Sequence, residues 1–459
     1  MTRGMRTFER LVASAQARYD CGELGPAAAE YRAALVLMPS HPRVLHNLGV
    51  ILAKQRDAAA ALECFGAALA ADSHYASAHY HRGVVLESIG RRPEAIDAFQ
   101  HAVICAPDHY AAHRSLAFNL LAEGRRGPAL DHFARLYELR RGEDRSDIAL
   151  SSLTCSNRTK LRHDAAQFRY LASLGRERER FTALAMHYER IGRDFPTQSQ
   201  RLSRAELEQL GEGYNTALYL ADAPEIAGPA LGPRPDAAEL VKQFSAGPGV
   251  LYCDDLLSPR ALLLLRRYLL QSTIWHDFSH IEGFVAAYLE DGLAHPLLLQ
   301  IADELRKAFP ELLSPHPLSQ AWAFKAVDPH GAIEAHADDA LVSVNFWVTP
   351  TGANRDPNRG GLTVCLTPPP ADLAPVDYQS RRADAVHFLE QNSQNRLVVP
   401  YRENRSVMFD SRLVHASDEP AFSGGYENHR ISVTLLFGTR RAGAAPMLTS
   451  QVGGPQDER

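Results

Sequence analysis

The chain has 459 residues, of which 45% are hydrophobic and 22% are charged, a composition typical of a globular protein with two or three domains. With a net charge of -5, the chain has no excess of basic residues that would attract a polyanion, so we expect no nucleic-acid partner. It shows neither the apolar core of a signal peptide nor an apolar run long enough to cross a membrane, so we expect a cytoplasmic protein without membrane contact. Six scattered cysteines without a CxxC pair favour free thiols over disulfides or a zinc site.

Small and aromatic residues recur at intervals of 34 residues in the N-terminal third, as Gly49 and Gly83 illustrate. Four aromatic residues keep the same interval: Tyr31, Phe65, Phe99 and Phe133. A small residue where two helices cross and an aromatic residue that fills the gap are typical of tetratricopeptide repeats. Residues 1–142 are therefore predicted to form a helical array that offers a surface to a protein or peptide. Several histidines around the repeats lack a metal-ligand spacing, so no metal site is expected there: His74, His79, His81, His101, His109 and His113.

Residues 143–235 lose the repeat phase but keep helical apolar spacing, and they end in a Pro/Gly-rich stretch. We interpret them as a helical connecting region that ends in a linker or an extended crossing segment. A second domain is expected over residues 236–445, with helices near 258–270 and 295–309. Short apolar segments follow, which predict the strands of a sandwich or barrel: 321–327, 332–335, 341–348, 361–366, 396–399, 406–409 and 431–437.

Three side chains in the second domain form a possible metal-ligand set. His336 and Asp338 are two residues apart, so on a strand they point to the same face. Together with His415 they make the pair of imidazoles and the carboxylate that leave positions open on iron(II) for oxygen chemistry. Arg430 and Ser432 share one face of a later, buried-looking strand, and a buried Arg needs an anionic partner such as a carboxylate.

Several motifs in this order resemble the 2-oxoglutarate/iron(II) oxygenase superfamily: His336-Ala-Asp338, Val342–Pro350, Gly360-Gly361, Asn404-Arg405, His415 and Gly424–Thr434. The arrangement is most similar to bacterial tetratricopeptide proteins with a C-terminal prolyl-hydroxylase-like domain. The resemblance implies a double-stranded β-helix, a jelly-roll barrel with flanking helices, followed by a flexible tail at 446–459. It also implies that His336, Asp338 and His415 bind Fe(II), and that Arg430 and Ser432 bind the distal carboxylate of 2-oxoglutarate. Many such domains have a Tyr on the strand before the His-x-Asp motif, whereas the segment 321–328 has none.

Other residues compete for these roles. His387 and His429 are alternatives to His415, but His429 adjoins Arg430 and should point to the opposite face of its strand. Asp339 and Asp410 are interpreted as structural or supporting carboxylates rather than ligands.

Asn345 shares a strand face with Ser343 and Trp347, and this face either lines the cosubstrate pocket or packs inside the barrel. We count Asn345 among the cosubstrate-binding residues. Lys325, on the strand before the His-x-Asp motif, is the second candidate for the carboxylate after Arg430.

The leading functional interpretation is a dioxygenase that uses Fe(II), 2-oxoglutarate and O2 to hydroxylate a C–H bond in a protein or peptide recruited by the repeats. The loops 350–359 and 368–395 are expected to flank the mouth of its site. A hydroxylase of small molecules and a non-catalytic scaffold remain as alternatives.

Overall fold

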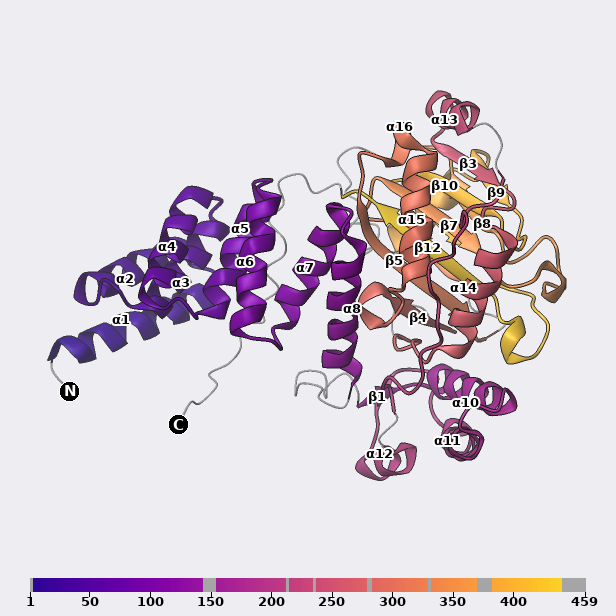
Figure 1. Ribbon diagram of the computed structural model, residues 1–459, viewed down its shortest axis with the longest axis horizontal. Helices are drawn as coiled ribbons and strands as arrows, with labels where there is room; N and C mark the ends of the chain where they lie inside the picture. The colour runs from indigo at the N-terminus through magenta and orange to yellow at the C-terminus, as the bar shows by residue number, and fades with distance from the viewer. Residues whose placement is uncertain are drawn as a thin grey trace. The chain divides into compact units, whose positions relative to one another are not determined.

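The computed structural model describes residues 3–142, 154–211, 214–233, 237–278, 283–328, 332–369 and 382–439. The chain forms two compact units, which divide at Leu120 inside helix α7 (Tyr110–Ala122) (Figure 1). The predicted tail at 446–459 and residues 370–381 of the predicted loop 368–395 lie outside the described residues.

The first unit consists of helices joined by short turns: α1 (Arg3–Asp20), α2 (Leu24–Leu37), α3 (Pro42–Lys54), α4 (Ala58–Ala71), α5 (Ala76–Ser88), α6 (Arg92–Cys105) and most of α7. Gly49 lies so close to Phe65 that an added Cβ would stand 2.7 Å from the ring. Gly83 and Phe99 repeat this contact one repeat later, at 2.6 Å. The small residues are therefore needed where the two helices of a repeat approach each other.

The histidines of the repeats have structural partners. His79 and His113 occupy equivalent positions, and their Nε2 atoms lie 3.0 Å from the carbonyl oxygens of Ser73 and Pro107. None of the repeat histidines belongs to a three-ligand group among the described residues.

The second unit contains further helices: α8 (Arg126–Arg141), α10 (Arg158–Ser173), α11 (Arg178–Gly192), α12 (Arg204–Leu210), α13 (Ala237–Ala246), α14 (Pro259–Gln271), α15 (Pro296–Ala308), α16 (Pro310–Leu313) and α18 (Arg382–Gln391). Sequence signals mark two of their starts. Ser203 and Glu206 form a capping box at α12, and Ser258 caps α14 with Pro259 in its first turn. Both caps satisfy backbone N–H groups that a helix start otherwise leaves unpaired.

Two antiparallel sheets form the β-rich part of this unit (Figure 1). The strand order of the six-stranded sheet is β3 (Val250–Cys253), β10 (Ser406–Asp410), β7 (Val342–Trp347), β12 (Ile431–Phe437), β5 (Leu318–Ala326) and β4 (Phe284–Tyr288). That of the four-stranded sheet is β6 (Ile333–His336), β11 (His415–Ser417), β8 (Leu362–Cys365) and β9 (Arg396–Val399). A shared core cluster joins the sheets, because Trp347 and Phe409 of the larger sheet pack with Val364 and Val399 of the smaller one. A short pairing of β1 (Cys155–Ser156) with β2 (Gln200–Arg201) lies among the helices of the unit.

The Pro/Gly-rich segment predicted to be a linker is bound to the second unit. The backbone N–H of Ile226 donates to Gln300, and that of Leu231 donates to Glu304, both on α15. Leu231 also forms an isolated β-bridge with Leu257. The Pro and Gly residues predict a linker or an extended crossing segment here, but they do not reveal the polar side chains on α15 that bind its backbone.

Helix α8 also belongs to the second unit, although the sequence places it with the repeats up to residue 142. The Tyr137 hydroxyl donates to the Thr273 carbonyl at 3.0 Å, and Arg141 forms a buried ion pair with Asp291 at 3.1 Å. These contacts hold α8 against the β-rich part and explain why the compact units divide before it.

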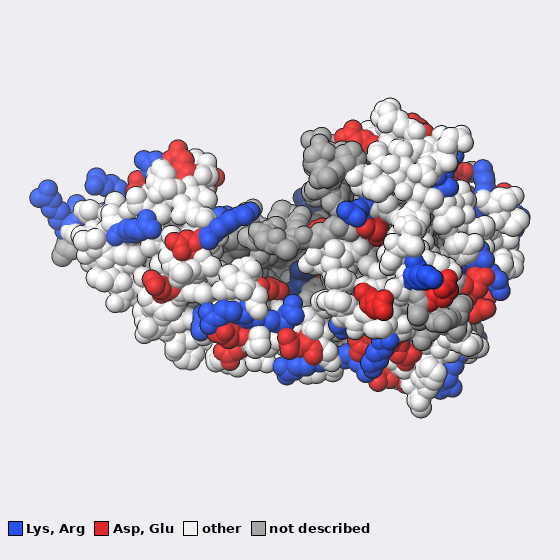
Figure 2. All heavy atoms as spheres, turned by 90° about the horizontal axis from the view of Figure 1, so that it is seen from above, with Lys and Arg blue, Asp and Glu red and all other residues white. Residues whose placement is uncertain are grey.

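No described helix combines the length and the low charge that crossing a bilayer requires. On the face in Figure 2, the described Lys and Arg side chains are interspersed with Asp and Glu.

Candidate metal centre

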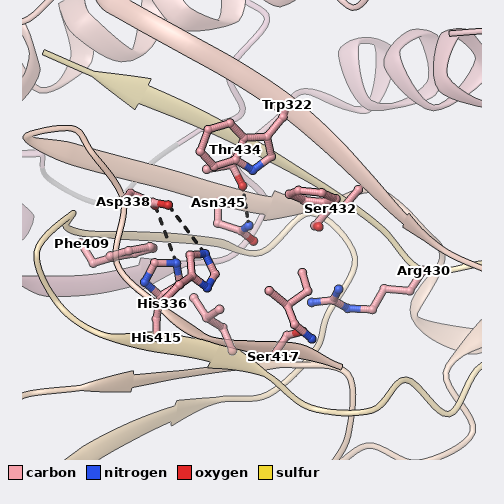
Figure 3. A pocket seen from close by; sticks show the side chains of 13 residues that line it. Trp322, His336, Asp338, Asn345, Phe409, His415, Ser417, Arg430, Ser432 and Thr434 are labelled. Carbon is pink, nitrogen blue, oxygen red and sulfur yellow. Dashed lines mark hydrogen bonds and ion pairs between the residues drawn. The ribbon is translucent and has the colours of Figure 1, made fainter. Parts of the chain in front are cut away.

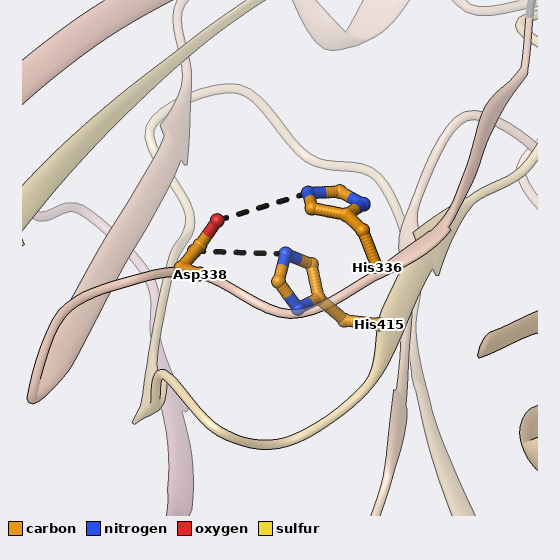
Figure 4. A group of neighbouring side chains, drawn as sticks. All are labelled: His336, Asp338 and His415. Carbon is orange, nitrogen blue, oxygen red and sulfur yellow. Dashed lines mark ion pairs between the residues drawn. The ribbon is translucent and has the colours of Figure 1, made fainter. Parts of the chain in front are cut away.

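Strand pairing brings the three predicted ligands together. His336 ends β6 and lies opposite His415, which begins β11. Asp338 follows β6 by two residues, and one ligand atom from each of the three lies within 4.8 Å of the others (Figure 4). This is the one group of three or more possible metal ligands among the described residues.

Both imidazoles are oriented by the backbone. Nδ1 of His336 lies 2.9 Å from the Glu334 carbonyl oxygen, and Nδ1 of His415 lies 3.0 Å from the Leu413 carbonyl oxygen. Each Nδ1 therefore carries the proton and donates it, which leaves the Nε2 lone pair free.

The free nitrogens face one carboxylate. Nε2 of His336 and Nε2 of His415 each lie 3.7 Å from a different oxygen of Asp338. This separation is too long for a hydrogen bond. The donor set of two neutral imidazoles and one carboxylate fits a divalent transition metal.

Burial favours the neutral imidazole of His415, which is the form that binds a metal. Burial, helped by the neighbouring His336, lowers the pKa of His415 to about 4. The imidazole is therefore neutral at physiological pH, as metal binding requires. Asp338 and His415 are buried, whereas His336 is partly exposed and marks the open side of the site.

The three ligands form part of the wall of a hollow between the two sheets (Figure 3). Side chains from both sheets line it: Trp322, Phe324, Ile333, His336, Asp338, Asn345, Leu362, Phe409, His415, Ser417, Arg430, Ser432 and Thr434. Two aromatic residues in its wall, Trp322 and Phe324, were not among the predicted site residues. The alternation of side chains along β5 could have identified these two residues, because Trp322 and Phe324 point to the same face of the strand.

Arg430 reaches into the hollow on the side away from the three ligands (Figure 3). Its Nε donates to the Gly360 carbonyl at 2.7 Å, but its Nη1 is buried without a hydrogen-bond partner. Burial lowers the pKa of Arg430 to about 10, so the guanidinium stays charged at neutral pH. A buried cation with an unused donor is a suitable partner for an anion.

Ser432 and Asn345 line the same hollow. The Asn345 amide donates to the Thr434 hydroxyl at 2.8 Å, while its buried carbonyl oxygen has no partner. Trp347, on the same face of β7 as Asn345, packs instead against Tyr401 in the core. Asn345 thus belongs to the pocket, and Trp347 to the packing between the sheets.

The competing histidines lie elsewhere. His387 is on α18 and contacts Gln391 within its own helix. His429 packs near Tyr426 and does not line the hollow, as its place beside Arg430 predicted.

Lys325 does not line the hollow either. It is therefore excluded as the second candidate for binding the carboxylate of 2-oxoglutarate. It is fully buried, and its Nζ lies 3.2 Å from the centre of the Tyr426 ring. Phe324 faces the hollow, so the next residue on the strand points to the opposite side of the sheet. Asp410 forms an ion pair with Arg412 and is not part of the ligand group.

Comparisons with known proteins identify the repeats. Residues 46–110 match the model of the family described as Tetratricopeptide repeat, which confirms the prediction for the N-terminal region. No curated protein sequence matches the chain.

Three solved structures illustrate the structural similarity. MamA from Desulfovibrio magneticus RS-1 is 27% identical, with a TM-score of 0.28 over 30% of this chain and 77% of that one. An O-GlcNAc transferase of Thermobaculum terrenum is 26% identical, with a TM-score of 0.28 over 30% of this chain and 28% of that one. The first TPR of Spaghetti (RPAP3), bound to an HSP90 peptide, is 18% identical, with a TM-score of 0.26 over 26% of this chain and 94% of that one. Scores this low carry no information on function.

Proposed function

We propose that the chain is an Fe(II)- and 2-oxoglutarate-dependent dioxygenase that hydroxylates a C–H bond in a protein or peptide side chain. One observation carries the proposal: a pre-oriented set of two imidazoles and a carboxylate shares a hollow with a buried, incompletely paired guanidinium. The three possible ligands and the Arg430 guanidinium form separate groups, and a metal-bound anion would engage both of them.

The metal would be held by Nε2 of His336, Nε2 of His415 and the carboxylate of Asp338. When bound, iron(II) supplies the reaction with O2 that couples loss of CO2 from 2-oxoglutarate to hydroxylation of the substrate. The chain itself would orient both imidazoles, because the carbonyl oxygens of Glu334 and Leu413 accept hydrogen bonds from their Nδ1–H groups.

Arg430 would bind the distal carboxylate of 2-oxoglutarate, with Ser432 beside it on β12. The unused Nη1 of Arg430 supplies the donor, and burial strengthens the charge-assisted pair. The unpaired carbonyl oxygen of Asn345 can accept a hydrogen bond from a ligand or a water in the same hollow.

The strand order also supports the proposal. Neighbouring strands in both antiparallel sheets are mostly distant in sequence, and the two sheets share a core, as expected of a jelly-roll domain. The triad lies where β6 and β11 of the smaller sheet meet. We therefore interpret the β-rich part as a double-stranded β-helix.

A protein or peptide substrate is favoured by the repeats, because tetratricopeptide arrays commonly bind peptides. Trp322 and Phe324, half-buried in the wall of the hollow, offer an apolar surface to a side chain near the metal. A non-catalytic interaction scaffold is the second candidate, since the repeat match alone indicates a protein-binding module.

The two candidates are separated by measuring succinate formed from 2-oxoglutarate by the iron-loaded chain in air. A dioxygenase releases succinate, and the correct peptide stimulates the release. Peptide pools and small-metabolite pools are compared, and Asp338→Ala serves as the inactive control. A scaffold shows no succinate above this control with any pool.

A further inference from the structure

The carboxylate of Asp338 is held by a hydroxyl from the opposite sheet. Ser343, on β7, donates to Oδ2 of Asp338 at 2.6 Å, and both side chains are buried. The bond is short, as expected for a hydroxyl that donates to an ionised carboxylate. No other described residue donates a hydrogen bond to this carboxylate.

A second hydroxyl orients the first. The Oγ atoms of Ser343 and Ser411 lie 2.8 Å apart. Because Ser343 donates its single proton to Asp338, Ser411 must be the donor between the two hydroxyls. The Ser411 carbonyl also accepts the backbone N–H of Asp338 at 2.9 Å. Ser411 therefore fixes both the backbone and, through Ser343, the side chain of Asp338.

This arrangement treats the two carboxylate oxygens unequally. Each oxygen lies 3.7 Å from one imidazole, Oδ1 from Nε2 of His336 and Oδ2 from Nε2 of His415, but only Oδ2 also accepts the hydroxyl of Ser343. A carboxylate with one oxygen engaged in this way cannot rotate freely. A free carboxylate can bind a metal through both oxygens, as carboxylates do in many calcium sites.

We propose that Ser343 is a positioning residue that makes Asp338 bind the metal through Oδ1 alone. The inference rests on the proposed function. With one ligand atom from each of His336, Asp338 and His415, a bound ion would keep positions open for 2-oxoglutarate and O2. If Asp338 used both oxygens, one of these positions would be lost. Ser343 thus preserves the open positions without touching the metal or the cosubstrate.

The test uses the full chain loaded with Co(II), whose visible absorption reports the coordination number. Ser343→Ala should bind Co(II) roughly 10–100-fold more weakly, the usual range for loss of a partner of a metal ligand, and the loaded variant should show a changed Co(II) spectrum and a raised Kd for 2-oxoglutarate. Ser343→Thr keeps the hydroxyl and should restore all three readouts. Ser411→Ala is the matched control, because it leaves the Ser343 bond to Asp338 and should have a smaller effect.

The inference is overturned if folded Ser343→Ala has the wild-type Co(II) spectrum and the wild-type Kd for 2-oxoglutarate. If Ser343→Ala does not fold, Ser343→Cys, which is similar in size but a weak donor, takes its place with the same expected shifts. Failure of the proposed function gives a different result, since wild-type protein would then bind neither Co(II) at this site nor 2-oxoglutarate.

Discussion

His336 and His415 form a cross-strand pair between β6 and β11, with their ring centroids 4.3 Å apart. The chain between them contributes strands to both sheets, so only the folded topology makes them neighbours. Their rings meet on the side where Asp338 leaves β6 (Figure 4).

Removal of the Asp338 carboxylate should abolish tight iron binding. Asp338→Ala leaves two imidazoles, which are too few ligands to hold Fe(II) against water, so we expect less than one tenth of wild-type occupancy after desalting. Iron is measured per folded chain by a colorimetric assay. The matched control is Asp339→Ala, which removes the adjacent carboxylate outside the ligand group and should retain iron. Wild-type occupancy in Asp338→Ala would exclude Asp338 as a ligand.

Arg430 should determine cosubstrate affinity without affecting the metal. A buried ionic partner left unmatched costs roughly 3–5 kcal/mol, so Arg430→Ala should raise the Kd for 2-oxoglutarate by more than ~100-fold. Arg430→Lys should raise this Kd by a smaller factor, because Lys keeps the charge but loses the forked donor. Ser432→Ala should weaken the binding of 2-oxoglutarate by about 1 kcal/mol, since it removes one hydrogen bond. Isothermal titration of the metal-loaded protein measures each value. Arg412→Ala, which removes a surface ion pair with Asp410, serves as the charge-matched control.

The stability of the second unit should fall in mild acid because of His295. This buried residue caps α15, accepting the N–H of Leu298 on Nδ1, and burial lowers its pKa to about 3. The unfolded chain binds a proton near pH 6.5, so stability is lost as the pH falls from about 6.5 towards 3. Between pH 7 and 5 the loss is about 2 kcal/mol.

The variant His295→Asn keeps an acceptor at the cap but does not titrate in this range. Urea unfolding at pH 7 and pH 5 should therefore show a smaller decrease for His295→Asn than for wild type. Equal decreases in the two proteins would assign the acid sensitivity to other buried groups.

Gly83 should be intolerant of a methyl group, because an added Cβ would stand 2.6 Å from Phe99. We expect Gly83→Ala to destabilise the first unit by about 1–3 kcal/mol, as overpacked cores usually are. Gly66→Ala is the control, since Gly66 lies in α4 with nothing within 4 Å of an added Cβ, and it should stabilise the helix by up to about 1 kcal/mol. Thermal unfolding compares the two variants. Similar melting temperatures for both would show that α5 and α6 adjust to the methyl group.

Elements of the fold that depend on a local pattern of side chains, such as alternation along a strand or a repeat interval, were predicted correctly. The strand expected at 431–437 is β12, and the small and aromatic spacing of the repeats corresponds to real close contacts at Gly49 and Gly83. β4 was missed, because Phe284–Tyr288 is buried on both faces and has no alternation to detect.

Features that depend on distant partners were not accessible from the sequence. The attachment of the segment containing Ile226 could not be predicted, because its acceptors lie far along the chain on α15. Lys325 seemed close to the cosubstrate site, but the pleat of β5 turns it away. For the site itself, His336 and Asp338 were paired by their spacing, His415 required the family resemblance, and the support from Ser343 required coordinates.

The most direct test of the central claim is an anaerobic titration of the wild-type chain with Fe(II) in the presence of excess 2-oxoglutarate. The account predicts a visible metal-to-ligand charge-transfer band that saturates at one iron per chain and is absent in Asp338→Ala. Its intensity should depend on 2-oxoglutarate with a Kd that Arg430→Ala increases. A folded wild-type chain that binds no iron at this site, or binds iron without developing the band, would contradict the account.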